Sequence, residues 1–171
     1  FIETRMTAKM PVMLREAGRR MRVGAGWVGV VTGACFAELG HDVVVRDIVS
    51  DKIDTLKRGE VPIHEPGLPE LLRKHVSSGR LRFTTSYAEV GAWADVHFIG
   101  VGTPQRPGES AADLRYVDAA TVSLAEHITR DALIVGKSTV PVGTAARLAG
   151  LLAEARAANG LPGTVELAWD P

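Results

Sequence analysis

The sequence is poor in the features that define several common classes of protein. One cysteine in 171 residues excludes an internal disulfide framework and is typical of a reducing, cytoplasmic setting. The 20 basic and 20 acidic residues balance, so no basic excess is present to neutralise nucleic-acid phosphates. No apolar run approaches the length that spans a bilayer. We therefore expect no nucleic-acid or membrane partner, and the length suits one domain with a sizeable core.

The histidines and several short motifs give no convincing site. The five histidines lack metal-ligand spacing, so we predict no metal site. Residues 136–138 (GKS) resemble the end of a phosphate-binding loop, but Asp131 stands where that motif needs a glycine. Cys35 falls on an apolar helix face with Leu39, where we expect a buried hydrophobic residue rather than a nucleophile. His64 and the glutamate after it could support acid–base chemistry, but a loop-anchoring role beside the prolines is favoured.

A glycine motif that opens an apolar, helix-like segment gives the strongest positive signal. Its spacing, GxGxxG, is typical of a tight strand-to-helix turn that binds a dinucleotide. The first glycine allows the turn, the second lets a pyrophosphate approach the backbone, and the third lets the helix pack closely on its strand. The motif consists of Gly24, Ala25, Gly26, Trp27, Val28 and Gly29.

An acidic residue at the end of the next apolar segment supports the same interpretation. Gly40 is expected to end the helix, residues 43–45 (VVV) predict a buried strand, and Asp47 follows them. A carboxylate about 20 residues beyond such glycines accepts hydrogen bonds from the adenosine ribose, and it would repel the 2′-phosphate of NADP. The sequence therefore predicts NAD as the cofactor. Ser50 is expected to cap the next helix, on which Lys52 lies either near the ribose and phosphates or in solvent.

Predicted strands and helices alternate along the chain, which indicates βαβ units and a doubly wound parallel sheet of the α/β class. The loops after two later strands carry hydroxyl groups, at Thr103 and at Ser138 and Thr139, and in such a sheet these loops share one edge with the glycine turn. That convergence predicts a single ligand site. We expect strands at 21–23, 43–45, 81–84, 96–101, 132–135 and 164–168, and helices at 27–39, 50–58, 69–75, 86–93, 114–129 and 145–158.

The start of the predicted domain is its weakest part. Residues 1–20 carry five basic and two acidic residues, so we interpret them as a disordered or loosely helical extension and assign the domain to residues 21–171. Only two of the three residues in strand 21–23 are apolar, whereas a central parallel strand is normally apolar throughout. We therefore expect a short strand whose arginines escape at the sheet edge, or a poorly fixed glycine loop, with marginal stability and weak NAD binding.

From Met21 onward the sequence closely resembles the amino-terminal domain of bacterial UDP-glucose 6-dehydrogenases. Sister enzymes that act on GDP-mannose or UDP-N-acetylmannosamine share several motifs, and a nucleotide-binding module without redox chemistry is the alternative from another class. The resemblance rests on GAGWVG at 24–29, VTGACFAELGHDV at 31–43, PIHEPGL at 62–68, GRLRFTT at 79–85, VGTP at 101–104, ADL at 112–114 and KSTVPVGT at 137–144.

The resemblance implies a Rossmann-type NAD-binding domain of a cytoplasmic enzyme that is a homo-oligomer at full length. That enzyme oxidises the C6 alcohol of UDP-glucose to a carboxylate in two NAD-dependent steps, through a cysteine-bound thiohemiacetal and thioester. By motif, the glycine loop with Val28 would bind the pyrophosphate, Asp47 and Lys52 the adenosine ribose, and Thr139 would position water beside the reacting centre. The residues that would line the cofactor are Val101, Gly102, Thr103, Pro104, Ser138 and Thr139.

Three departures from the family pattern affect this interpretation. The first strand is several apolar residues shorter than usual, and Trp27 replaces the usual tyrosine. The printed sequence ends with Asp170 and Pro171, at the positions where the family has Asn-Pro-Glu, so the glutamate of that pattern is not in it. Cys35 does not match the family's nucleophile. We therefore expect this chain alone to bind NAD without oxidising the sugar.

Overall fold

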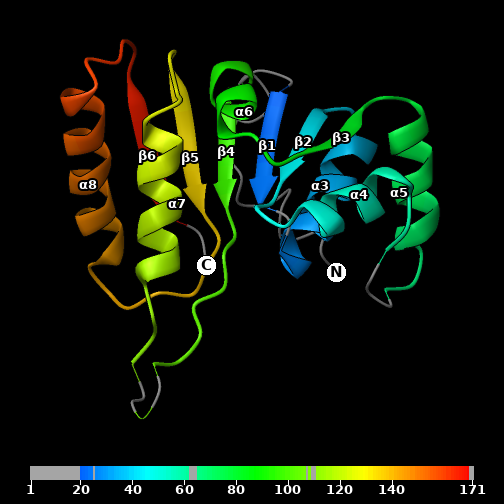
Figure 1. Ribbon diagram of the computed structural model, residues 1–171, viewed down its shortest axis with the longest axis horizontal. Coiled ribbons are helices and arrows are strands. Elements are labelled where there is room, and N and C mark those ends of the chain that lie inside the picture. Colours follow the sequence, from blue (N-terminus) through cyan, green and yellow to red (C-terminus); the bar gives the residue numbers. More distant parts are fainter. Residues whose placement is uncertain (1–19, 25, 62–64, 107, 109–110, 170–171) are drawn as a thin grey trace.

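The computed structural model describes residues 20–24, 26–61, 65–106, 108 and 111–169. Within these residues, six strands form one all-parallel sheet in the order β3-β2-β1-β4-β5-β6 (Figure 1). The strands are β1 (Arg20–Gly24), β2 (Asp42–Arg46), β3 (Leu81–Thr84), β4 (Val96–Ile99), β5 (Ala132–Gly136) and β6 (Val165–Trp169). The helices are α3 (Trp27–Glu38), α4 (Ser50–Lys57), α5 (Leu68–Ser77), α6 (Tyr87–Trp93), α7 (Arg115–Ala125) and α8 (Thr144–Ala158).

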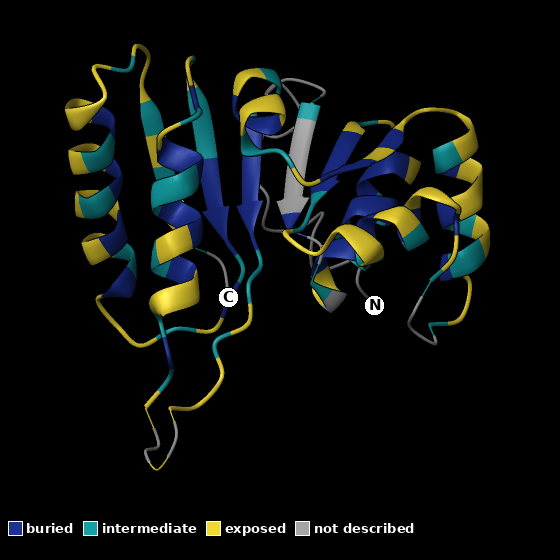
Figure 2. Ribbon diagram, in the orientation of Figure 1, coloured by how far each residue is buried: buried dark blue, intermediate teal, exposed yellow. Residues whose placement is uncertain are grey.

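Helices cover both faces of the sheet, which gives the doubly wound α/β class that the sequence predicts. Helices α3, α4 and α5 enclose one buried apolar cluster with β2 and β3, and α7 and α8 enclose a second one with β4 and β5. Figure 2 shows largely buried strands beneath helices whose outer faces are exposed. The strand order changes direction between β1 and β4, and ligands of open α/β sheets bind beside such a switch point.

Two helix ends lie where the sequence predicts: Gly40 follows the end of α3, and Ser86 precedes the start of α6. Gly40 has a left-handed φ of 100°, and the N–H groups of Gly40 and His41 donate to carbonyl groups in the last turns of α3. This is the Schellman arrangement that commonly ends a helix at glycine. The Ser86 hydroxyl accepts the N–H of Glu89 and so caps α6.

Two predicted helix boundaries are wrong. Ser50 does not cap α4, because it already lies inside the helix; the preceding N–H, of Val49, donates to Asp47 Oδ1 at 3.1 Å. Helix α7 ends at Ala125 rather than at residue 129, because the Leu124 carbonyl accepts the N–H groups of both residues 127 and 128 in a tight turn. Apolar spacing that continues past a helix end misled the prediction in the second case.

The apolar face predicted for α3 is only partly correct. Ala34 is fully buried and Cys35 is partly buried, so the cysteine packs as a small side chain without being fully enclosed. Leu39 is 56% exposed, because it follows the last turn of α3 and the chain then reverses at Gly40.

Strand β1 occupies the central slot of the sheet despite its low apolar content. It begins at Arg20, one residue before the predicted start, and pairs along its whole length with β2 and along residues 21–23 with β4. The strand is therefore not short, since it matches the five residues of β2. Arg20 lies at the amino end of β1 with a partly exposed side chain, and its Nε lies 3.5 Å from Asp95 Oδ2. The side chains of residues 21–23 lie outside the description.

Several sequence-based interpretations concern residues that the structure does not describe: the extension at 1–19, Ala25, His64 and the last two residues. Among the described residues, no helix combines the length and the apolar content of a membrane span. The same residues contain no group of three or more histidine, cysteine or acidic side chains that could hold a metal ion.

Candidate functional site

The loops that the sequence singles out meet at the carboxyl edge of the sheet, at the lower end of the strands in Figure 1. Because the strands are parallel, the loops after β1, β2, β4 and β5 all leave at this edge. The register sets Gly24 beside Arg46 and Ile99 beside Gly136. The structure thus brings the glycine loop, Asp47 and the two hydroxyl-bearing loops to one side of the molecule.

The second glycine of the motif is required by the close approach of another loop. Helix α3 begins after Gly26, and no side chain caps its first turn, so these N–H groups have no side-chain acceptor. A Cβ atom on Gly26 would lie 2.9 Å from the carbonyl oxygen of Gly100, in the loop after β4. Val28 is 58% exposed on this first turn, whereas Ala25 and the Trp27 side chain lie outside the description. An uncapped helix start beside a bare backbone fits a diphosphate.

The structure changes the role predicted for the first glycine and points to a further glycine. Gly24 has no left-handed φ, and a Cβ atom there would make only ordinary contacts at 3.7 Å or more. A close approach of helix and strand is visible at Gly33, where a Cβ atom would lie 2.9 Å from Cγ2 of Val45. The packing role predicted for Gly29 stays a prediction. Sequence reasoning missed Gly33, although it lies four residues beyond Gly29 and therefore on the same face of α3.

Asp47 is held in a fixed position at the end of β2. Its Oδ1 accepts the N–H of Val49 at 3.1 Å, and its Oδ2 lies 2.8 Å from the ammonium of Lys52. The Asp47 side chain is 17% exposed and that of Lys52 is 32% exposed, so both reach the surface from a partly buried setting. The carboxylate retains lone pairs for further donors, such as the hydroxyl groups of a ribose.

The loops after β4 and β5 are joined by their own hydroxyl groups. Ser138 is buried, and its Oγ donates to the Val101 carbonyl at 2.7 Å. Thr103 Oγ1 donates to the Thr139 carbonyl at 3.0 Å. Both hydroxyl groups therefore already donate their proton to a backbone carbonyl. The Ser138 hydroxyl could bind a cofactor only as a hydrogen-bond acceptor. Gly102, Pro104 and Thr139 are partly or fully exposed at the same edge.

Sequence reasoning missed Trp169, which supports this pair of loops. Its indole Nε1 donates to the Ser138 carbonyl at 2.9 Å. Its ring lies so close to Gly136 that a Cβ atom there would overlap it. The signal that could have found this contact is the register, since Gly136 and Trp169 are partners across β5 and β6.

The strand order, the switch point beside β1 and the uncapped glycine loop followed by Asp47 define a dinucleotide-binding α/β domain. The model of the UDP-glucose/GDP-mannose dehydrogenase family, NAD binding domain, matches residues 20–171. The chain belongs to that family and is its NAD-binding domain, which confirms the resemblance and the cofactor expected from the sequence.

Relatives and solved structures agree with this assignment. The chain is 52% identical over 122 residues to UDP-glucose 6-dehydrogenase of Rhizobium meliloti, covering 71% of this chain and 28% of the relative. It is 48% identical over 132 residues to UDP-glucose 6-dehydrogenase YwqF of Bacillus subtilis, covering 77% and 30%. A UDP-glucose dehydrogenase structure from Pyrobaculum islandicum superposes with a TM-score of 0.78 at 40% identity, covering 89% of this chain and 35% of that one. The chain therefore spans about a third of the length of the proteins it matches.

Proposed function

We propose that this chain is the cofactor-binding part of an enzyme that oxidises UDP-glucose to UDP-glucuronate with two molecules of NAD. The observation that carries the proposal is the joint placement of the uncapped turn at Gly26 and the fixed carboxylate of Asp47 at one sheet edge. Similarity favours UDP-glucose as the substrate, because the UDP-glucose 6-dehydrogenases above reach 48–52% identity, against 42% over 129 residues for GDP-mannose 6-dehydrogenase of Pseudomonas savastanoi.

Each part of the edge has a distinct task in this proposal. The first-turn N–H groups of α3 donate to the pyrophosphate, assisted by the positive end of the helix dipole. Asp47 accepts hydrogen bonds from the adenosine ribose, and Lys52 holds that carboxylate in place. The segment 101–104 lines the cofactor beyond the switch point, and the Ser138 hydroxyl fixes its start through the Val101 carbonyl. When bound, NAD supplies a hydride acceptor.

Thr139 is the candidate for a role next to the reacting centre. Its backbone carbonyl is fixed by the Thr103 hydroxyl, while the residue itself is exposed at the edge. A hydroxyl group on this fixed backbone can orient a water molecule towards a thioester. We do not assign the nucleophilic cysteine of that thioester to Cys35, which is partly buried within α3. A homo-oligomeric, cytoplasmic enzyme is part of the same proposal.

The test uses the full reading frame that encodes this domain. Purified enzyme is mixed with NAD and with UDP-glucose, GDP-mannose or UDP-N-acetylmannosamine in turn, and NADH formation is followed by absorbance. We expect the highest kcat/KM with UDP-glucose and two NADH per sugar oxidised. A higher kcat/KM with either sister substrate would replace the proposed sugar, and no NADH with any of them would favour a binding module without redox chemistry.

A further inference from the structure

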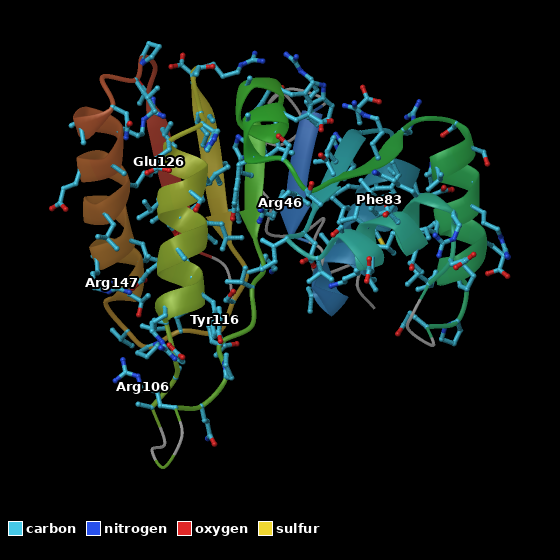
Figure 3. All side chains as sticks on the ribbon, in the orientation of Figure 1. Arg46, Phe83, Arg106, Tyr116, Glu126 and Arg147 are labelled. Atoms are coloured by element: carbon cyan, nitrogen blue, oxygen red, sulfur yellow. The ribbon has the colours of Figure 1, made fainter. Side chains whose placement is uncertain are left out.

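Arg46 has an unusual position at the candidate site. It is the last residue of β2, directly before Asp47, and its register partner is Gly24 of the glycine loop. The guanidinium carbon lies 3.6 Å from the centroid of the Tyr87 ring, and Nε donates to the Thr85 carbonyl at 3.1 Å. Figure 3 labels Arg46 near the centre of the molecule, at the lower end of the strands. Thr85, in the loop between β3 and α6, and Tyr87, the first residue of α6, thus fix a cation at the carboxyl edge.

The guanidinium has no anionic partner among the residues that the structure describes. The nearest carboxylate in sequence, Asp47, is paired with Lys52 instead. Arg46 is half-buried, and its one hydrogen bond uses Nε, so both Nη groups and the guanidinium face opposite Tyr87 lack a described protein partner. A half-buried cation stacked on one side only offers a flat, weakly hydrated surface to a ligand.

We propose that Arg46 is a stacking platform for the adenine ring of the cofactor. This inference rests on the proposed placement of the ribose at Asp47, because adenine is bonded directly to that ribose and must lie beside it. Arg46 and Ile48 flank Asp47 in the chain, and Ile48 is an apolar side chain that is 74% exposed. A planar base can lie on the guanidinium of Arg46, as bases do on arginine in nucleic-acid complexes. The Tyr87 ring packs against the opposite face of the guanidinium.

Stacking makes a different prediction from attraction of the pyrophosphate by a point charge. Lysine keeps the charge of arginine but has no plane and does not stack in the same way. Arg46→Leu and Arg46→Lys are therefore both informative. Arg82 provides a matched control, because its guanidinium also lies over an aromatic ring, that of Trp93 at 4.8 Å. Arg82 lies on β3 and not next to Asp47.

The test is calorimetric titration of the full chain and its variants with NAD, ADP-ribose and nicotinamide mononucleotide. We expect Arg46→Leu and Arg46→Lys to lower the affinity for NAD and ADP-ribose by roughly three- to thirtyfold. Nicotinamide mononucleotide, which has no adenine, should bind the unmutated chain and both variants equally. Arg82→Leu should keep the affinity of the unmutated chain for all three ligands.

Four results would overturn the inference. Unchanged NAD affinity in Arg46→Leu would show that Arg46 does not stack on adenine, and it would not contradict the proposed function. If Arg46→Lys binds NAD as tightly as the unmutated chain, Arg46 acts as a charge near a phosphate. If the variants bind nicotinamide mononucleotide more weakly by the same factor as NAD, the substitutions cause a general loss of structure. If the unmutated chain binds neither NAD nor ADP-ribose, both the proposed cofactor site and the stacking role of Arg46 are contradicted.

Discussion

The ammonium of Lys52 lies 2.8 Å from Oδ2 of Asp47, while the other carboxylate oxygen accepts the N–H of Val49. Asp47 is thereby bonded to the start of α4 on both oxygens and does not swing freely at the end of β2. A carboxylate fixed before the ligand arrives loses less side-chain entropy on binding. The pair also explains why Lys52 is not simply a surface charge in solvent.

Asp47→Asn should lower NAD affinity by roughly ten- to a hundredfold, since hydrogen bonds to a charged group contribute about 1.5–3 kcal/mol. NADP affinity should fall less, because the substitution also removes repulsion of the 2′-phosphate, so the preference for NAD should narrow. Calorimetry with both cofactors measures this change. Asp54→Asn, an exposed carboxylate on α4, is the control and should have no effect. Equal affinity for NAD and NADP in the unmutated chain would contradict the role assigned to Asp47.

Ser138→Ala should destabilise the domain by about 1–3 kcal/mol, because it leaves the Val101 carbonyl without the hydroxyl that now bonds it at 2.7 Å. Thr139→Val, at the next residue, should change the free energy of unfolding by less than about 0.5 kcal/mol. Urea unfolding of both variants measures the difference. The reverse order of effects would mean that the Ser138 bond does not hold the two loops together.

Gly91→Ala should destabilise the domain by about 1–3 kcal/mol or more, because a Cβ atom on Gly91 of α6 would overlap the backbone of His127. Gly150→Ala is the matched control inside α8, where nothing lies within 4 Å of the new Cβ atom. That change should stabilise the domain by about 0.5–1 kcal/mol through helix propensity. Thermal unfolding separates the two variants, and similar melting temperatures would show that α6 can move away from the end of α7.

The side-chain hydrogen bond from Arg115 lowers the pKa of Asp113 from 3.8 to about 2, assisted by the Arg115 N–H. Because the folded pKa is below the unfolded one, the ionised carboxylate stabilises the fold above about pH 3.8, and this contribution is lost as the pH falls through about 2. Asp113→Asn should therefore be less stable than the unmutated chain at neutral pH, with a difference that shrinks over this acidic range. Urea unfolding at several pH values tests it. A constant difference would show that the charge of Asp113 is not involved.

This chain alone should bind NAD but produce no NADH when mixed with UDP-glucose. The family resemblance places the thioester-forming cysteine in sequence that the printed chain does not contain, and Cys35 is partly buried within α3. The assay compares absorbance of NADH with and without the sugar, in a preparation free of other dehydrogenases. Sugar-dependent NADH formation would mean that the chemistry has been misassigned.

The sequence predicted the parts of this structure that depend on local chemistry. Gly40 and Ser86 act through bonds to residues close in the chain, and Val43 to Val45 are apolar because helices cover both faces of β2. Contacts between distant segments were not predictable in this way. The Ser138 hydroxyl donates to the carbonyl of Val101, which is distant in sequence. The chain just after the early end of α7, at His127, packs against Gly91 of α6. Both contacts exist only once the strand order has set the loops side by side.

The approach of Gly100 to Gly26 has a consequence for how the domain is made. The phosphate loop follows β1, but the carbonyl that shapes it follows β4, which is synthesised after β2, β3 and helices α3 to α6. Pairing of β1 with β4 is a contact of long sequence separation, so it forms late relative to local structure. A nascent chain that has not yet released β4 contains the complete glycine motif but lacks the neighbour that shapes it. Cofactor binding during synthesis would therefore report that both halves of the sheet have come together.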